Sequence, residues 1–531
     1  MKKFLPLVLV LILGAFLRLW QISAVPNGLT WDEAAIGYNA YSILKTGRDE
    51  HGAFLPVIFK SFGDYKPGAY IYLTVPSIAL FGLSEFAVRF PSAIFGILGI
   101  LGIYLLVNIL LPPPKSTIYD LRSTAAATAA ALSPWLVHFS HGAWETNVFV
   151  TLLLFGIYYF LRFVQNKSTI FPTLFFACFS LAMYQGAKLL VPLVYLLLIT
   201  IYFKDISWSF LKNFKTVPFV VFGLWIYFGA LFGSAGNRLA RLSIFTYKPN
   251  IVSDNNLFHN QTLLSTNLVI SRYLWHFSPE VLLYEGKIIS ERAHVPGAGL
   301  LNPLEFIFLI SGFIYLVKYL SSKSKILLLG LLLLAPIPGS LTLSEFSPVR
   351  SLFMAYPLAI ISGLGIYYLF SSSKVIFAFC AVGYSLATLY IFDLYFFHSQ
   401  TVFATEFNYG YKEAVQLIKD NPTSKVIFTD VYGQPYIYYL FYTKYDPATY
   451  QKENNFISGG LDVGKVERVG NVRFQQFGQS ELSLEKDTLF VGTEGNINRD
   501  FDIAGDGVKL FRQIETPDKK IIFRVVKISK P

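Results

Sequence analysis

Two short polar segments near the start of the chain contain residue types suited to proton transfer and phosphate binding. One contains the adjacent carboxylates Asp32 and Glu33, and the other reads Asp64, Tyr65, Lys66 directly before a proline. A carboxylate can take the proton of a hydroxyl group, and a lysine ammonium can bind phosphate oxygens as a point charge. Two plainer interpretations stay open: a solvated acid pair, and a lysine that reaches from the lipid boundary to water.

A third polar segment contains His138, His141 and Glu145 between two apolar blocks. An acid at the edge of a membrane is costly unless it is paired or functional. Glu145 could instead favour the start of the next helix, which Thr146 or Asn147 would cap. The two histidines and Glu145 could also bind a metal, so a divalent cation is a possible cofactor, although no ligand set stands out.

The composition requires a solvent other than water for most of the chain. The 531 residues are 54% hydrophobic and only 15% charged, whereas a soluble domain has about a quarter of its residues charged. The net charge of +11 comes from basic residues between apolar blocks, where such residues orient membrane spans. This distribution argues against a nucleic-acid partner. Cys178 and Cys380 both lie inside apolar blocks and form no ligand pattern.

The apolar blocks have the length of helices that cross a bilayer. We expect about eleven spans, the first of them uncleaved, at about 4–22, 89–111, 123–137, 147–163, 170–184, 189–203, 216–233, 303–320, 326–342, 351–370 and 375–397. The apolar stretch at 67–86 contains Pro76, and counting it as a span would reverse the charge bias of every later loop. We therefore interpret it as a juxtamembrane or re-entrant helix.

With the N-terminus in the cytoplasm, most basic loop residues lie inside, and the short outer loops contain only Lys188 and Arg350. This layout predicts a mainly α, multi-pass protein of the plasma membrane with an extracytoplasmic C-terminus. Residues 1–400 form the expected membrane domain, with long outer loops at 23–88 and 234–302. Long loops of this kind are usually functional.

Residues 401–531 regain charge and predict a soluble α/β domain outside the membrane. A helical pattern runs from Tyr411 to Asp420, and strand patterns occupy 425–429, 488–491 and 520–527. The tyrosine-rich stretch from Tyr432 to Tyr445 could bind carbohydrate, but core or interface packing is the favoured interpretation. A part in acceptor recognition is a hypothesis for this domain.

The expected layout places Asp32, Asp64, Lys66 and Glu145 on one side of the membrane. Transfer of a sugar from a lipid phosphate needs a base for the incoming hydroxyl and a cation for the departing phosphate. It also needs an apolar groove for the isoprenoid tail. No P-loop or dinucleotide fingerprint is present.

The pattern of these residues resembles the family 39 glycosyltransferases of the GT-C superfamily, which include protein O-mannosyltransferases and bacterial aminoarabinose transferases of lipid A. The resemblance rests on Trp31-Asp32-Glu33-Ala34, Gly63-Asp64-Tyr65-Lys66-Pro67, Arg89-Phe90-Pro91-Ser92-Ala93, Ser133-Pro134-Trp135 and Trp144-Glu145. It covers residues 1–400, most clearly 15–165. Relatives often have an acid directly before the Lys-Pro pair, where this chain has Tyr65, and often have aspartate at the position of Glu145.

The resemblance implies that Asp32 is the catalytic carboxylate, that Lys66 contacts the donor phosphate and that Glu145 occupies a second acidic position. We group Glu33 with these catalytic candidates. The candidate substrate-binding residues are Asp64, Tyr65, Lys66, Arg89, His141, Arg292, His294 and Arg350. A structural role stays open for Arg292, His294 and Arg350.

The predicted function is inverting transfer of a monosaccharide from a polyprenyl-phosphate donor to an extracytoplasmic protein, lipid or glycan acceptor. Two other functions stay open. One is a ligase or polymerase that uses lipid-linked oligosaccharides. The other is a transporter or flippase, for which the chain lacks the expected inverted repeats and midplane ionisable residues.

Overall fold

The computed structural model describes residues 4–111, 120–166, 169–232, 243–247, 257–258, 260–284, 290–344, 346–422, 424–453, 456–459, 463–482, 487–498 and 508–528. The chain forms two compact units. The first contains Met1–Trp20 and Ser92–Tyr395, and the second contains Gln21–Pro91 and Phe396–Pro531. The boundary at 395/396 is close to the expected one at 400. The outer loop at 23–88, which we expected within the first domain, packs with the C-terminal part instead.

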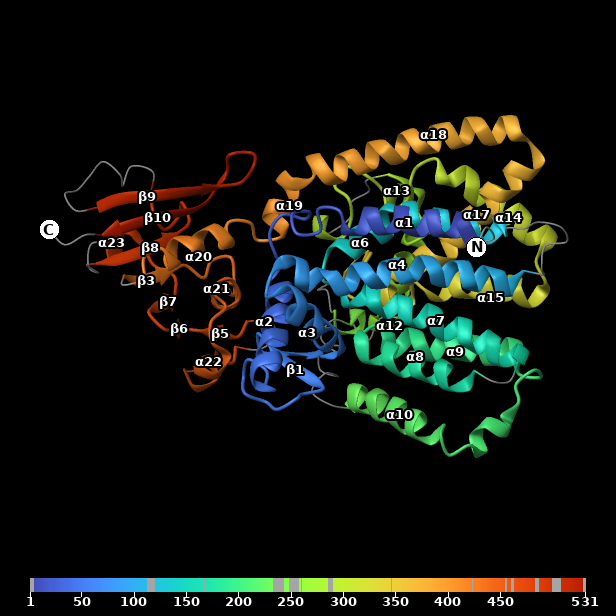
Figure 1. Cartoon of the computed structure of the whole chain (residues 1–531), viewed down its shortest axis with the longest axis horizontal. Helices are drawn as coiled ribbons and strands as arrows, with labels where there is room; N and C mark the ends of the chain where they lie inside the picture. Colours follow the sequence, from blue (N-terminus) through green and yellow to red (C-terminus); the bar gives the residue numbers. More distant parts are fainter. Residues whose placement is uncertain are drawn as a thin grey trace. The chain divides into compact units, whose positions relative to one another are not determined.

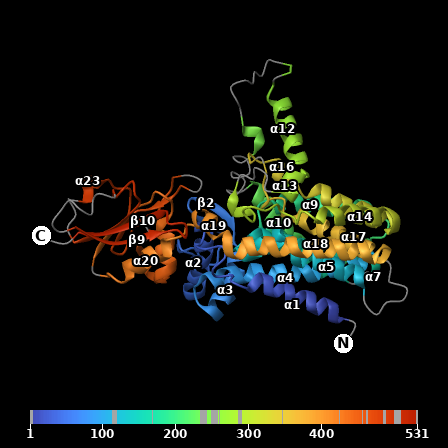
Figure 2. The same ribbon diagram turned by 90° about the horizontal axis from the view of Figure 1, so that it is seen from above.

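The first unit is helical (Figure 1). Its helices are α1 (Leu5–Leu19), most of α4 (Glu85–Leu110), α5 (Leu121–Leu132), α6 (Pro134–His141), α7 (Glu145–Asn166), α8 (Ile170–Met183), α9 (Ala187–Tyr202), α10 (Val217–Phe232), α12 (Gln261–Trp275), α13 (Pro279–Leu283), α14 (Glu305–Tyr319), α15 (Ser322–Leu334), α16 (Ile337–Ser340), α17 (Ala355–Ser372) and α18 (Lys374–Asp393). Figure 2 shows α12 crossing the direction of the other long helices of this unit.

Each segment expected to span the membrane coincides with one or two of these helices. Within the described residues, five helices are long and apolar enough to cross a bilayer: Glu85–Leu110, Glu145–Asn166, Ser322–Ser340, Leu352–Ser372 and Lys374–His398. The expected span at 123–137 is broken into α5 and α6, because Pro134 cannot continue the preceding helix and instead starts a new one, capped by Ser133. The exact number of spans stays a prediction.

Small residues allow the helices of the first unit to pack closely. A Cβ added to Gly363 of α17 would lie only 2.2 Å from the Cα of Ala126 in α5. Such contacts between backbones are typical of membrane helices, where small side chains replace the hydrophobic effect as the basis of association. Arg18 of α1 is fully buried and donates to the carbonyl oxygens of Ala130 (3.0 Å) and Ala131 (3.1 Å) in α5.

The second unit combines helices with a mixed sheet. Its N-terminal elements are α2 (Trp31–Thr46), β1 (Ile58–Ser61), β2 (Asp64–Pro67) and α3 (Ala69–Phe81). Its C-terminal elements are α19 (Gln400–Glu406), α20 (Tyr411–Lys419), β3 (Lys425–Phe428), α21 (Pro435–Thr443), α22 (Pro447–Glu453), β4 (Phe456–Ile457), β5 (Lys465–Val466), β6 (Arg468–Val469), β7 (Val472–Phe474), α23 (Gln479–Leu482), β8 (Thr488–Gly492), β9 (Val508–Glu515) and β10 (Ile521–Ile528).

The main sheet has the strand order β6-β7-β3-β8-β10-β9. Strand β3 pairs in parallel with both β7 and β8, whereas the outer pairs are antiparallel. Figure 1 shows α20 beside this sheet. The predicted α/β character, the helix at 411–420 and all three predicted strands are confirmed. Tyr436, Tyr438 and Tyr439 are buried, as the core interpretation of that stretch predicts, whereas Tyr432 is 41% exposed.

Hydrogen bonds join the N-terminal elements of the second unit to its C-terminal part. The Tyr438 hydroxyl donates to the Leu29 carbonyl oxygen at 3.0 Å. The Gln451 amide donates to Ser42 Oγ and Thr46 Oγ1, each at 3.1 Å, and to the Asp49 carbonyl oxygen at 2.9 Å. Helix α2 therefore belongs to the same packed core as α21 and α22.

Candidate active site

Asp32 and Lys66 form an ion pair in the second unit. Asp32 lies in the first turn of α2, where the helix dipole favours a carboxylate. Its side chain is 43% exposed, whereas that of Lys66 is only 16% exposed. The carboxylate is therefore accessible to a ligand while the ammonium is held beside it. This arrangement joins two residues that the sequence assigned to proton transfer and phosphate binding.

A complete capping box fixes the start of α2. The Thr30 hydroxyl accepts from the Glu33 amide N–H at 3.2 Å, and the Glu33 Oε2 atom accepts from the Thr30 amide N–H at 3.0 Å. This reciprocal pair satisfies two amide groups that a helix start otherwise leaves without partners. It also determines where the side chain of Asp32, between the two, leaves the helix.

A tight hairpin positions Lys66. Strands β1 and β2 pair so that Lys66 lies opposite Phe59, and both central turn residues, Phe62 (φ 54°) and Gly63 (φ 86°), have positive φ. That backbone matches a type I′ turn, the favoured two-residue connection, and it is unfavourable for a phenylalanine. Burial of Phe62 and the bond from the Gly464 amide to its carbonyl oxygen (3.0 Å) hold it there. The Lys66 ammonium also lies 5.2 Å from the centre of the Phe62 ring.

The neighbours of Lys66 differ in accessibility. Asp64 is only 2% exposed, whereas Tyr65 is 36% exposed. Side chains alternate between the two faces of a strand, so Asp64 and Lys66 share a face and Tyr65 points to the opposite one. Asp64 and Tyr65 were both predicted to bind substrate. Of these two residues, only Asp64 lies on the same face of the strand as Lys66.

Glu33 and Arg89 form a buried, two-point ion pair. Arg89 Nε donates to Glu33 Oε1 at 2.9 Å, and Nη2 donates to Oε2 at 3.3 Å. The remaining guanidinium hydrogens bind the carbonyl oxygens of Ile22 (3.0 Å), Pro26 (2.9 Å) and Gly28 (2.6 Å). A guanidinium has five N–H donors, and all five are engaged within the protein. These contacts show that Glu33 and Arg89 hold the start of α2 in place.

Glu50 is a functional candidate that our sequence reasoning missed. It is fully buried and exchanges two hydrogen bonds with Asn39 of α2, each 3.0 Å long. Burial raises the pKa of Glu50 to about 8, and Lys66 acts in the opposite direction through its positive charge. A pKa raised to this range favours the protonated form of Glu50 at neutral pH. The sequence does not indicate that Glu50 is buried, because its neighbours in the chain are also polar.

Replacing Glu50 with glutamine should remove a pH dependence of stability. The folded pKa lies above the ordinary value of 4.5, so the folded state binds the proton more tightly than the unfolded chain does. The stability contributed by this group is complete below pH 4.5 and is lost as pH rises to about 8. We expect Glu50→Gln to raise the apparent unfolding temperature relative to wild type increasingly between pH 6.5 and 8.5.

The contribution of the neighbouring His51 to stability changes mainly between its folded pKa of about 4 and its ordinary pKa of 6.5, and His51 is the same in both proteins. The measurement is thermal unfolding of both proteins in lipid nanodiscs at pH 6.5, 7.5 and 8.5. A difference between the two proteins that does not change with pH would contradict the assignment of a proton to Glu50.

In the first unit, Glu145 lies in the first turn of α7 and is half-buried. The nearby histidines are engaged with backbone: His138 Nε2 donates to the carbonyl oxygen of Arg292, and His141 Nε2 to that of Leu17, both at 2.9 Å. His141 is also fully buried. These bonds give His138 and His141 a role in holding segments of the unit together.

Arg292 and His294 lie in and directly after a short 3-10 helix, η4 (Glu291–Ala293). Arg292 is half-buried, and His294 is 3% exposed, with Nδ1 at 3.4 Å from the Ser290 carbonyl oxygen. Within the residues that the structure describes, no group of three His, Cys, Asp or Glu side chains could hold a metal ion. The metal site left open for His138, His141 and Glu145 is therefore not formed by these three side chains.

Two arginines of the first unit converge on the segment after α16. Arg272 of α12 donates to the carbonyl oxygen of Thr342, and Arg350 Nη1 donates to Thr342 Oγ1 and Ser344 Oγ, each at 3.2 Å. His276 donates through Nδ1 to the Arg272 carbonyl oxygen at 2.7 Å, and burial lowers its pKa to about 4. The positive charge here comes from the arginines, because His276 is neutral at physiological pH. Of these two arginines, the sequence reasoning selected Arg350 and missed Arg272.

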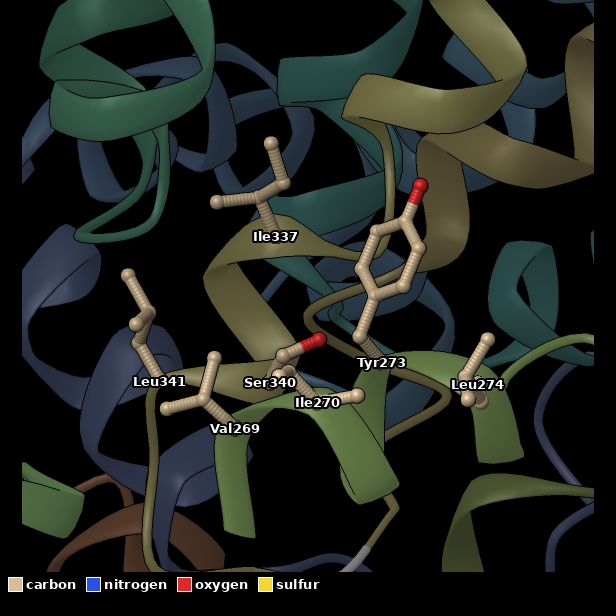
Figure 3. Close-up of a pocket in the computed structure, with 7 residues that line it drawn as sticks. All are labelled: Val269, Ile270, Tyr273, Leu274, Ile337, Ser340 and Leu341. Carbon is tan, nitrogen blue, oxygen red and sulfur yellow. The ribbon is translucent and has the colours of Figure 1, made fainter. Parts of the chain in front are cut away.

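An apolar pocket of about 160 Å³ lies between α12 and the segment from α16 to Leu341 (Figure 3). Helix α12 contributes one wall, and α16 with the residue after it contributes the other. The lining residues are Val269, Ile270, Tyr273, Leu274, Ile337, Ser340 and Leu341. Arg272 is next to Tyr273 in the chain, and the backbone bond from Thr342 to Gly339 (3.2 Å) ties the arginine-binding segment to α16. A charged group and an apolar tail on one ligand could bind here together.

The structure thus brings Asp32, Lys66, Asp64, Glu33 and Arg89 into the second unit and places Glu145, His141, Arg292, His294 and Arg350 in the first. Each predicted site residue is a described residue. Within the second unit, the exposed Asp32 and the largely shielded Lys66 are in contact, and the buried pair of Glu33 and Arg89 lies at the same helix start.

The chain is similar to known glycosyltransferases both in part of its sequence and in its fold. Residues 66–228 match the family described as dolichyl-phosphate-mannose-protein mannosyltransferase. The crystal structure of apo ArnT from Cupriavidus metallidurans matches with a TM-score of 0.55 and 12% identity, covering 99% of this chain and 98% of that one. ArnT bound to undecaprenyl phosphate matches with a TM-score of 0.55 and 13% identity, covering 99% of both chains.

The archaeal oligosaccharyltransferase AglB from Archaeoglobus fulgidus, in complex with an inhibitory peptide and a dolichol-phosphate, matches less well. Its TM-score is 0.47 at 11% identity, with 83% of this chain and 64% of that chain covered. Comparison with curated proteins gives no significant match. The sequence match over residues 66–228 and the full-length structural match agree with the resemblance described above, and the chain has the fold of ArnT.

Proposed function

We propose that this protein transfers a monosaccharide from a polyprenyl-phosphate donor to an extracytoplasmic acceptor, with inversion at the anomeric carbon. The observation that carries the proposal is the ion pair of an exposed Asp32 with a largely shielded Lys66. A base and a phosphate-binding cation held together are what this transfer requires. The donor class is supported by the fold shared with ArnT, which has been crystallised with undecaprenyl phosphate.

In the proposed mechanism, the Asp32 carboxylate takes the proton of the acceptor hydroxyl as its oxygen attacks the anomeric carbon. The bond between that carbon and the phosphate oxygen breaks, and both of its electrons leave with polyprenyl phosphate. The Lys66 ammonium stabilises the added negative charge on the phosphate. Glu33 and Arg89 hold the start of α2, and Glu145 stays a candidate for the second acidic position.

The proposal is tested by the release of free polyprenyl phosphate from purified protein in nanodiscs, with a panel of polyprenyl-phosphate monosaccharides and mixed acceptors. Lys66→Met should raise the donor KM and lower kcat/KM at least about tenfold, because a hydrogen bond to a charged group contributes about 1.5–3 kcal/mol. Lys60→Met is the matched control, since Lys60 lies in the same hairpin and its ammonium contacts the Phe456 ring.

Wild-type kinetics in Lys66→Met would exclude phosphate binding by this lysine. If the protein used lipid-linked oligosaccharides and none of the monosaccharide donors, the proposed function would become oligosaccharide transfer. Turnover with neither donor class in a folded protein would remove the glycosyltransferase proposal.

A further inference from the structure

A second polar pocket lies in the second unit, at the carboxyl end of the central strand β3. It has a volume of about 150 Å³. The residues that line it are Asp430, Gly433, Gln434, Pro435, Tyr436, Val463, Lys465, Val466 and Phe474. Strand β3 is flanked by the parallel strands β7 and β8. In open α/β sheets, ligands bind outside the carboxyl ends of parallel strands.

The polar groups of this pocket include a carboxylate oxygen that has no partner. Asp430 Oδ2 accepts from the Lys465 ammonium at 2.8 Å, and the lysine side chain is 65% exposed. Asp430 Oδ1 is buried and has no hydrogen-bond partner among the described residues. A buried polar atom without a partner costs free energy, and the residue that carries it, Asp430, lines the pocket.

The pocket is connected to the ion pair of Asp32 and Lys66 by two sets of contacts. On one side, the ring of Trp31, the residue before Asp32, lies against Gly433, where an added Cβ would be 3.1 Å from Trp31 Cζ3. On the other side, Phe62 packs edge-on against Tyr436, with 6.1 Å between the ring centres. Phe62 also contacts the Lys66 ammonium. A ligand in this pocket therefore borders the structural elements that hold both reacting groups.

We propose that this pocket is an acceptor subsite that binds one sugar unit of a glycan. The inference rests on the proposed function and adds the acceptor class to it. Asp430 accepts from one sugar hydroxyl, and the Lys465 ammonium donates to a neighbouring one. The volume is well below the roughly 300 Å³ at which drug-sized pockets begin and suits a single ring.

A peptide acceptor fits these features less well. One serine or threonine hydroxyl would use only part of the paired carboxylate and ammonium. Extended peptides usually add to an exposed sheet edge, whereas this pocket lies at the end of β3, which has a strand on each side. The glycan is therefore the better-matched occupant, and a peptide becomes an outcome of the test.

The first measurement is direct binding of neutral oligosaccharides of two to four hexoses to the full-length protein, by saturation-transfer NMR. The protein is held in nanodiscs, because glucoside and maltoside detergents would compete for a sugar site. Wild type should bind at least one of these glycans. Asp430→Asn and Lys465→Met should each weaken its binding about tenfold or more, the loss expected for a hydrogen bond to a charged group.

Asp420→Asn is the matched control, since Asp420 is exposed on the same unit, at the end of α20. Lys465 is largely exposed, so Lys465→Met tests the site even if Asp430→Asn fails to fold. No glycan binding by folded wild type, or binding by both pocket variants that is as tight as that of wild type, would overturn the subsite. Binding of a neutral serine- and threonine-containing peptide that is lost in both variants would overturn the glycan assignment.

A kinetic measurement separates this inference from the proposed function. With a glycan acceptor that wild type uses, both pocket variants should raise the acceptor KM about tenfold and leave the donor KM unchanged. An unchanged acceptor KM would reject the subsite while transfer stands. Glycan binding that depends on Asp430, in a protein that turns over no lipid-linked donor, would reject the transferase and keep the pocket.

Discussion

Asp32→Asn should lower kcat for sugar transfer by about 100-fold or more, because general acid–base catalysis typically contributes 10²–10⁴-fold. Asparagine preserves the size of the side chain and its position in the first turn of α2, but it cannot accept the proton of the acceptor hydroxyl. The donor KM should change little if Lys66 remains in place. The measurement is steady-state release of polyprenyl phosphate in nanodiscs with saturating acceptor.

Glu85→Gln is the matched control for this substitution. Glu85 is also a carboxylate in the first turn of a helix and also pairs with a lysine, Lys412, at 2.9 Å. Loss of activity in Asp32→Asn but not in Glu85→Gln would assign the effect to the proton acceptor rather than to the loss of an acid at a helix start. Full activity in Asp32→Asn would show that another group removes the proton.

The second large effect is on stability. Arg89→Met should destabilise the protein by about 3–5 kcal/mol, the typical cost of removing one partner of a buried ion pair. The substitution leaves the Glu33 carboxylate buried and removes the donor from three backbone carbonyl groups. Arg89→Lys should recover little, because an ammonium has three donors where five are in use.

Membrane proteins often unfold irreversibly, so the readout is the apparent unfolding temperature at a fixed heating rate. Lys412→Met is the control, since that lysine is 61% exposed and an exposed pair contributes at most about 1 kcal/mol. Equal unfolding temperatures for Arg89→Met and Lys412→Met would contradict the structural role of Arg89. A folded Arg89→Met protein should also lose transfer activity, because the capping of α2 orients Asp32.

Much of the local structure follows from local sequence patterns. The apolar blocks coincide with helices because length and hydrophobicity suffice to define a helix in a bilayer. The strand runs at 425–429, 488–491 and 520–527 are strands because their β-branched and aromatic residues suit a pleated, buried surface. The start of α2 was also available in the sequence, since Thr30 followed by Glu33 is a capping-box signature. That signal was overlooked.

The sequence also selected Asp32 and Lys66 by residue type and by their resemblance to a family, and the structure brings them into contact across 34 positions. Residue type alone does not separate roles within such a cluster. Glu33 is adjacent to Asp32 in the chain, yet Glu33 pairs with the buried Arg89 whereas Asp32 pairs with Lys66. The difference is a matter of the direction in which each side chain leaves the first turn of α2.

Tertiary structure alone decided which distant segments pack together. The loop at 21–91 joins residues 396–531 in one unit through contacts such as that of Tyr438 with Leu29, which are more than 400 residues apart. Segments far apart in the chain likewise decide three other features. These are the burial of Glu50, the convergence of Arg272 and Arg350, and the unpartnered oxygen of Asp430. Periodicity and capping report on neighbours within a few residues, whereas the environment of a polar side chain is set by whatever the folded chain places around it.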